Sequence, residues 1–249
     1  MKKAVTVEEG NVLMTADFSQ MEVRVLAHIT EDPNLILAIR EGLDFHSYTA
    51  SKVFGIPYEE IKGNKDQEPY ASMRQKAKSA TFGVIYGASQ RGLAFQMGIS
   101  EEEASQIIGK FFEGFPKVKA WIEEVHQFVR ENGYYFTPMG RVRRFYLEES
   151  VNGSALREAQ NFPIQSYASD LTLAAAFRIM RFIKPLGGKI VGLVHDSIEV
   201  EAPEARIDDV VRIVQGAMTT YLEEMFQLRV PLKAEIEVGK NWADVEEIK

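Results

Sequence analysis

The order of strand-like and helix-like segments limits this chain to a narrow set of folds. A short apolar run at residues 11–16 suits a buried strand, and it stops at Asp17. Two more strand-like runs, at 189–194 and 198–201, come only after a long section with helical patterns, and alternating apolar residues at 232–238 predict a final strand. Such segregated elements favour an α+β fold, in which a small antiparallel sheet holds both ends of the chain and a helical insertion projects from it.

The long middle section carries clear start and stop signals for helices. Caps, prolines and apolar spacing predict helices from about Gln20, from Asp32 to before Gly42, and over 46–54, 70–86, 100–113, 116–132 and 154–183, with one of about twenty residues after Pro203. The polar segment 55–68 predicts a loop, and 134–145 predicts a hairpin that turns at Pro138-Met139-Gly140. Pro163 predicts a kink, or a division into two helices, within 154–183.

Composition excludes several classes of protein. With 249 residues and 45% apolar side chains, the chain can bury a core. No stretch approaches the roughly 18 uninterrupted apolar residues of a membrane span, and the first five residues lack the apolar core of a secretory signal. We therefore expect a cytoplasmic protein.

Charge and the lack of cysteine restrict the kinds of site the chain can form. Without cysteine, any metal must bind to oxygen or imidazole. The net charge of -7 excludes a uniformly basic nucleic-acid surface, because such binding draws its affinity from Lys and Arg. Local basic runs at 74–78 and 141–144 would have to contact phosphates, although a single run of this kind is also typical of a solvated face.

Two aspartates occupy positions where a rigid sheet can present a carboxylate. Asp17 lies at the exit of one strand, and Asp196 lies at the tip of the hairpin formed by 189–201. If those strands are neighbours, the two carboxylates meet, and two-metal phosphoryl transfer needs shared carboxylates that hold ions about 3.5 to 4 Å apart. The alternative is that both aspartates simply end strands in turns.

The helix predicted over 70–86 carries a chemically unusual stripe. Arg74, Lys78, Phe82 and Tyr86 follow one another at steps of four residues, so they wind slowly along one side of a helix. Two cations followed by two aromatic rings suit a nucleoside triphosphate, whose phosphates need charge and whose base needs a flat surface. An ordinary amphipathic helix with its rings in the core is the alternative.

These residues closely resemble the three polymerase motifs of family A DNA polymerases, the bacterial DNA polymerase I group. The matching segments, in the same order and with the same spacing, are Asp17 to Arg24 (DFSQMEVR), Arg74 to Gly87, and Val194-His195-Asp196. Asp44-Phe45-His46 is similar to the family's small phosphate-contacting segment. The likeness runs from about Lys2 to the C-terminus.

The resemblance implies the palm and fingers of a right-hand polymerase. Residues 1–26 and 151–249 would form the palm, and 27–150 would form helical fingers that contain the 70–86 helix. The thumb that normally precedes the first motif is absent from the sequence, as are proofreading and 5′-nuclease domains. The chain would therefore hold DNA weakly, and we expect either a fragment or the product of a split gene whose partner chain supplies the thumb and exonuclease.

The resemblance also assigns chemistry to single residues. Two Mg²⁺ ions, which Mn²⁺ can replace, would bind to Asp17, Asp196 and the backbone carbonyl of Phe18 and would drive transfer of a deoxynucleotide onto a primer 3′-hydroxyl with release of pyrophosphate. Lys78 would lie along the phosphates and protonate the pyrophosphate, and Arg74 and His46 would grip the triphosphate. The remaining nucleotide contacts would come from Gln20, Glu22, Phe82 and Tyr86.

Selection and DNA contact follow from the same resemblance. Glu22 and Tyr86 would leave no room for a 2′-hydroxyl, and Phe82, where some relatives have Tyr, predicts poor use of dideoxynucleotides. The duplex contacts near the primer end would read shape and not base identity; their residues are Arg24, Arg157, Asn161, Gln165 and His195. His195 could alternatively serve only to pack the hairpin.

Two further departures from the family pattern stand out. Ser197 replaces the glutamate that usually follows the second aspartate, which predicts a shift in metal affinity or rate without loss of activity. Gln165-Ser166-Tyr167 replaces the usual Gln-Gly-Thr and predicts a changed approach of the backbone to the duplex.

Two rival functions remain open at this stage. A metal-dependent nuclease also pairs aspartates with lysine, but it would not need the aromatic stripe. An inactive DNA-binding or assembly module derived from a polymerase should have lost Asp17, Asp196 or Lys78, and all three are present.

Overall fold

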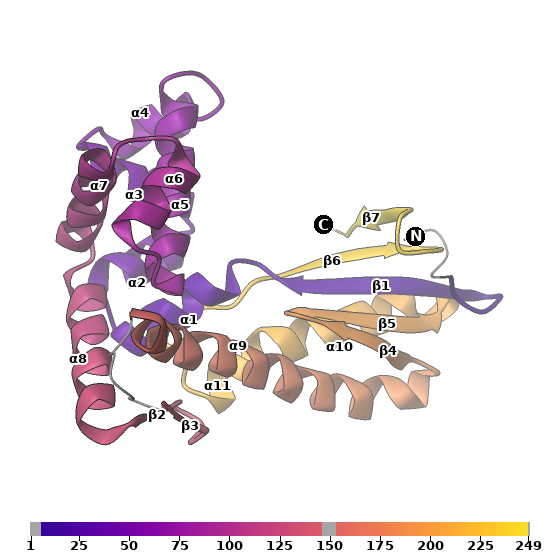
Figure 1. Ribbon diagram of the computed structural model, residues 1–249. Coiled ribbons are helices and arrows are strands. Elements are labelled where there is room, and N and C mark those ends of the chain that lie inside the picture. Colours follow the sequence, from indigo (N-terminus) through magenta and orange to yellow (C-terminus); the bar gives the residue numbers. More distant parts are fainter. Residues whose placement is uncertain (1–5, 146–152, 249) are drawn as a thin grey trace. The chain divides into compact units, whose positions relative to one another are not determined.

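The computed structural model describes residues 6–145 and 153–248. The chain divides into two compact units, which we call unit 1 (Met1–Arg24 and Tyr167–Lys249) and unit 2 (Val25–Ser166). Unit 1 contains the five-stranded sheet and unit 2 is mainly helical (Figure 1). The predicted α+β fold, with a helical segment inserted between the parts of a small antiparallel sheet, is confirmed.

The sheet of unit 1 is assembled from both ends of the chain. Its strand order is β4-β5-β1-β6-β7, and every neighbouring pair is antiparallel. The strands are β1 (Asn11–Phe18), β4 (Lys189–Val194), β5 (Ser197–Pro203), β6 (Ala234–Gly239) and β7 (Val245–Glu247). The first strand thus lies in the centre of the sheet, because the C-terminal strands pair on both of its sides.

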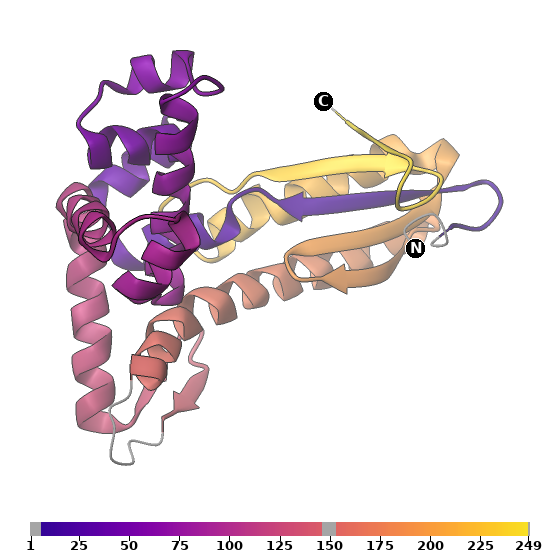
Figure 2. The same ribbon diagram turned by 45° about the horizontal axis from the view of Figure 1, so that its top comes forward.

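One face of this sheet is covered by helices. Alternate residues of β1, among them Met14 and Ala16, are fully buried, as are Ile198 and Val200 of β5. Helix α10 (Ile207–Met218) packs against β1, β5 and β6, and it lies on the same side of the sheet as the part of α9 (Gly153–Ile183) that belongs to unit 1 (Figures 1 and 2). Burying this face leaves the other row of side chains, which includes Asp17, on the opposite face.

Unit 2 is built from short and medium helices joined by short turns. The helices are α1 (Met21–Thr30, which begins in unit 1), α2 (Pro33–Arg40), α3 (Phe45–Phe54), α4 (Tyr58–Gly63), α5 (Tyr70–Tyr86), α6 (Gln90–Met97), α7 (Glu101–Gly114) and α8 (Pro116–Asn132), and they are followed by a hairpin of β2 (Tyr134–Phe136) and β3 (Val142–Arg144). The start of α9 completes the unit.

Helix α5 is fixed by packing on one side and by a glycine at its end. Its buried side includes Ala77, Ala80 and Val84, and it packs against α3. Gly87 ends the helix in the left-handed region, with φ of +67°. A side chain at Gly87 would strike Arg157, so both the conformation and the space at this position require glycine.

The local predictions fail where short elements depend on distant contacts. The predicted loop 55–68 contains α4, whose Ile61 is fully buried against Ala50 and Ala77. Helix α6 was not expected, although Ser89 caps it and Gly98 ends it. Strand β7 was not expected either, because three residues carry too little pattern to mark a strand.

Two longer predictions also need correction. The single helix expected after Pro203 is divided into α10 and α11 (Thr220–Met225), since the backbone of Thr219 leaves the helical region at φ −120° and ψ −97°. At Pro163 either a kink or a division into two helices was predicted, and the division is wrong because Gly153–Ile183 form one helix. Among the described residues, no helix is long and apolar enough to cross a membrane.

Candidate active site

The register between β1 and β5 brings two distant aspartates close together in unit 1. Asp17 pairs directly with Ser197, and Asp196 is the residue before it, in the turn between β4 and β5. The negative charge of Asp196 is one of the causes of a raised pKa at Asp17, as expected for carboxyl groups that are near each other. The two carboxylates therefore stand at the same end of the sheet.

The Asp17 carboxyl group holds its proton unusually tightly. Its pKa rises from 3.8 to about 6, chiefly because burial removes water and then because of repulsion from Asp196, Glu235, Glu199 and Glu237. Carboxylates that repel one another in this way would be stabilised by a cation placed among them.

The acidic character extends across the exposed face of the sheet. In the row of side chains next to Asp17, Thr15 pairs with Glu199 on β5 and with Glu237 on β6, and Glu237 in turn pairs with Glu247 on β7. Together with Asp17 these side chains line a pocket of about 480 Å³. No Lys, Arg or His is found among the described residues that line it.

The carboxylates of Asp17 and Asp196 suit a hard divalent cation that also binds oxygen atoms of water or phosphate. Among the residues that the structure describes, no three His, Asp or Glu side chains are grouped closely enough to hold a metal by themselves. Mg²⁺ commonly binds through one or two carboxylates and completes its shell with water and substrate phosphates. Two neighbouring aspartates of an all-oxygen site therefore fit that ion, whereas a closed structural metal site does not fit.

Backbone strain occurs at two of the predicted site residues of unit 1. Gln20 has φ of +55° just before α1, and His195 has φ of +57° at the start of the turn that carries Asp196. Non-glycine residues in the left-handed region are uncommon and often mark functional sites. His195 is exposed, so the alternative in which it only packs the hairpin is not favoured.

The stripe of α5 faces away from the core of unit 2. None of Arg74, Lys78, Phe82 and Tyr86 is buried, and Tyr86 is 48% exposed. Tyr86 therefore does not fill the core, and Phe82 is only half-buried. His46, on the first turn of α3, joins this stripe, with its ring centroid 6.2 Å from that of Phe82.

His46 is held in its neutral form. Its pKa falls from 6.5 to about 4, first because of burial and then because of the positive charges of Arg74 and Lys78. Its Nδ1 is buried without a hydrogen-bond partner among the described residues. Two cations and a neutral imidazole are thus gathered on one surface of unit 2, which suits an anionic group such as a phosphate.

The other predicted residues of unit 2 lie around the C-terminal end of α5. The Gln165 side chain donates to the Tyr86 hydroxyl at 3.3 Å, and the Asn161 side chain donates to the Ile85 carbonyl at 3.5 Å. Arg157 is exposed and lies over Gly87.

Two predicted residues of unit 1 stand at the start of α1. Glu22 is half-buried in its first turn. The Arg24 guanidinium donates to the carbonyls of Ser19 and Pro231 at 2.8 and 2.6 Å, so much of its donor capacity supports the fold of unit 1.

Comparison with known proteins identifies the family. The family model described as "DNA polymerase family A" matches residues 1–244. The chain belongs to DNA polymerase family A.

Curated proteins named DNA polymerase I are similar to this chain over nearly its whole length. DNA polymerase I, thermostable, of Thermus aquaticus is 38% identical over an alignment of 252 positions, which covers 99% of this chain and 29% of the relative. DNA polymerase I of Caldicellulosiruptor bescii is 39% identical over 97% of this chain and 28% of its own length. This family A chain thus spans less than a third of the curated relatives it matches.

A solved structure with a similar fold covers nearly the whole of this chain. It is the POL domain of Pol1 from M. smegmatis in complex with DNA primer-template and dNTP, with a TM-score of 0.85 and 34% identity. The similarity covers 97% of this chain and 42% of that one.

One polar network beside Asp17 was not predicted from the sequence. Glu199 is only 5% exposed, and its carboxylate accepts hydrogen bonds from the hydroxyls of Thr15 at 2.6 Å and Ser197 at 2.8 Å. The position of Glu199, two residues after Ser197, could have indicated the bond between these two side chains. The bond to Thr15 depends on the pairing of β5 with β1, which the sequence does not show. The ion pair between Asp44 and Arg74 was not predicted either.

Proposed function

We propose that this chain catalyses template-directed addition of deoxynucleotides to a primer 3′-hydroxyl, with release of pyrophosphate. The observation that carries the proposal is the pairing of Asp17 with Ser197, which makes Asp17 and Asp196 neighbours at the exposed end of a rigid sheet. Membership of DNA polymerase family A supports the same activity.

In this proposal unit 1 supplies the metal-binding carboxylates. Asp17, Asp196 and the Phe18 carbonyl would hold two Mg²⁺ ions, or Mn²⁺ in their place. When bound, such ions lower the pKa of an attacking hydroxyl and neutralise charge on phosphates. The sheet holds both aspartates at fixed spacing, so that little reorganisation is needed when the ions bind.

Unit 2 would hold the nucleotide through the stripe of α5. Lys78 and Arg74 carry the charge that a triphosphate requires, and neutral His46 would add a hydrogen bond. Lys78 is exposed and free to approach a ligand, and it would give a proton to the departing pyrophosphate. Phe82 and Tyr86 would offer flat surfaces to the sugar and base.

Substrate selection would depend on size and stacking. Glu22 and Tyr86 would each contact the sugar of the nucleotide and would leave no room for a 2′-hydroxyl. Primer and template would be contacted through sugars, phosphates and minor-groove acceptors. Such contacts do not depend on base identity, as a polymerase that must accept any sequence requires. The residues that would make them are Gln20, Arg24, Arg157, Asn161, Gln165 and His195.

We assign the names palm and fingers to the two parts of the chain as a proposal. Residues 1–26 and 151–249 would be the palm, and 27–150 the fingers. Additional DNA-binding surface would come from polypeptide outside the matched segment, either in one longer chain or in a separate partner.

Primer extension tests the proposed activity. Asp196→Asn should reduce magnesium-dependent extension by roughly a thousandfold, equivalent to about 4 kcal/mol of lost transition-state stabilisation. Asp208→Asn, which changes an exposed acid at the start of α10, should retain the wild-type rate. The assay is run with this chain alone and with a longer polypeptide, in which this chain is joined to the segments that its relatives have outside the matched region.

The outcome also separates the rival functions. Degradation of the primer without synthesis, abolished by Asp196→Asn, would favour a nuclease. DNA binding with no chemistry in either form of the protein would favour an inactive module. Equal extension by wild type and Asp196→Asn would contradict the proposed role of this aspartate.

A further inference from the structure

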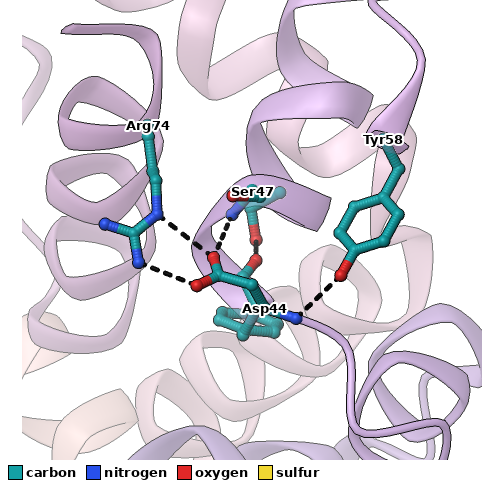
Figure 3. Close-up of polar contacts among 6 residues, drawn as sticks. Asp44, Ser47, Tyr58 and Arg74 are labelled. Carbon is teal, nitrogen blue, oxygen red and sulfur yellow. Dashed lines mark hydrogen bonds and ion pairs between the residues drawn. The ribbon is translucent and has the colours of Figure 1, made fainter. Parts of the chain in front are cut away.

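A bidentate ion pair joins the start of α3 to α5 within unit 2. Arg74 donates from Nε to Oδ1 of Asp44 at 3.1 Å and from Nη2 to Oδ2 at 2.9 Å (Figure 3). Paired bonds of this kind fix the plane of the guanidinium as well as its position. The side chains of Arg74 and Asp44 are 31% and 26% exposed, so the pair is partly shielded from water.

Asp44 is itself rigidly held. Its carboxylate accepts a hydrogen bond from the Ser47 backbone at 2.8 Å as the N-cap of α3, and its own backbone N–H donates to the Tyr58 hydroxyl at 3.0 Å (Figure 3). Burial opposes ionisation of Asp44, but the hydrogen bonds from Arg74 and Ser47 outweigh it and hold its pKa well below the ordinary value. The carboxylate is therefore a charged and immobile anchor.

The pair leaves part of the Arg74 guanidinium available. A guanidinium has five N–H donors in a planar fork. Asp44 takes the edge formed by Nε and Nη2. The donors of Nη1 lie on the other side of the fork, so an anion can bind there while the ion pair persists.

Asp44 also caps the helix turn that carries His46. His46 lies two residues after Asp44, in the first turn of the helix that Asp44 caps. Its ring faces Phe82 of α5. One carboxylate thus fixes both an arginine on α5 and the turn of α3 that carries the histidine.

We propose that Asp44 is a positioning residue that orients Arg74 and His46 for binding of a nucleoside triphosphate. This inference rests on the proposed function, because it assumes that these side chains bind phosphate. Asp44 does not touch the nucleotide; it acts through Arg74, whose side chain would otherwise sample many rotamers. Such preorganisation raises affinity by lowering the entropy lost on binding.

Calorimetric binding of inorganic tripolyphosphate, without metal, tests the inference on the intact chain. Asp44→Ser keeps an N-cap acceptor but cannot reach Arg74, and Asp44→Asn keeps the cap and one possible bond while removing the charge. We expect Asp44→Ser to weaken binding about tenfold and Asp44→Asn to weaken it less. Ser100→Ala removes the N-cap of α7 in the same unit and should lower the melting temperature without changing affinity.

A double-mutant cycle separates positioning from a general structural effect. If Asp44 acts through Arg74, Asp44→Ser should add little to the loss caused by Arg74→Ala. Independent, additive losses would overturn the inference, as would equal or tighter binding by Asp44→Ser, which would mean that Asp44 withholds Arg74 from the ligand. If Arg74→Ala leaves tripolyphosphate binding unchanged, the proposed triphosphate site fails and the inference fails with it.

Discussion

At the scale of single residues, the site of unit 1 is governed by repulsion among carboxylates. Asp17 is surrounded by Asp196, Glu235, Glu199 and Glu237, and only Asp196 among them belongs to the residues that the sequence marks as metal-binding. Glu199 is buried and its charge is held by two hydroxyl groups. The usual glutamate after the second aspartate is thus replaced by a serine that bonds to another glutamate.

The raised pKa of Asp17 predicts a pH-dependent metal site. Protons and cations compete for this carboxylate, so Mg²⁺ or Mn²⁺ affinity should fall by up to about tenfold for each pH unit below about 6. In metal-free protein, the raised pKa favours folding below about pH 4, and this contribution is lost as the pH rises through about 6. Titration of Mn²⁺ binding from pH 5 to 8 measures the effect.

Substitution of Glu199 tests the origin of that shift. Glu199→Gln keeps the acceptor for Thr15 but removes a negative charge, so the midpoint of the metal-binding profile should move to lower pH. Glu224→Gln changes the net charge equally at an exposed site on α11 and should leave the midpoint unchanged. A common shift in both variants would assign the effect to net charge and not to Glu199.

At the scale of elements, the C-terminal edge of the sheet depends on close backbone approach. Gly239 ends β6, where it pairs with Leu13 on one side and Val245 on the other. A Cβ at this position would overlap the carbonyl oxygen of Asp244. The Asp244 carbonyl belongs to the backbone and cannot rotate away from a new Cβ as a side chain could. A side chain at position 239 would therefore force β6 and β7 apart.

A pair of glycine substitutions in unit 1 should therefore have opposite effects. Gly239→Ala should lower the free energy of unfolding by about 3 kcal/mol or more, because the clash involves backbone. Gly216→Ala, in α10 with open space around it, should raise stability by about 0.5–1 kcal/mol through helix propensity. Urea denaturation measures both, and similar small changes at the two sites would contradict the packing of β7.

At the scale of the whole molecule, two units carry two separate kinds of chemistry. Unit 1 holds the acidic carboxylates on a sheet, and unit 2 holds the cations and aromatic rings on helices. Because unit 2 is inserted between the two parts of unit 1, the carboxylates of unit 1 come from distant segments, whereas the cations and rings of unit 2 come from one continuous segment. Each unit has its own buried core.

Separate ligands should therefore stabilise separate units. Mg²⁺ should slow amide hydrogen exchange in β1 and in the hairpin of β4 and β5, and tripolyphosphate should slow it in α3 and α5. A ligand at a hundred times its Kd stabilises the unit that binds it by about 2.7 kcal/mol. Equal slowing of both units by either ligand would mean that the whole chain unfolds as one cooperative body.

The sequence by itself predicted the types of the longer elements and the candidate site residues. The stripe of α5, the strand ending at Asp17 and the hairpin at Asp196 are local patterns, so their neighbours in sequence suffice to identify them. Only the tertiary structure decided the register that sets Asp17 opposite Ser197, the bond from Thr15 to Glu199 and the pairing of Asp44 with Arg74. These contacts join distant segments, and their packing free energy exceeds local preferences. The same holds for α4, whose buried Ile61 packs against Ala50 and Ala77.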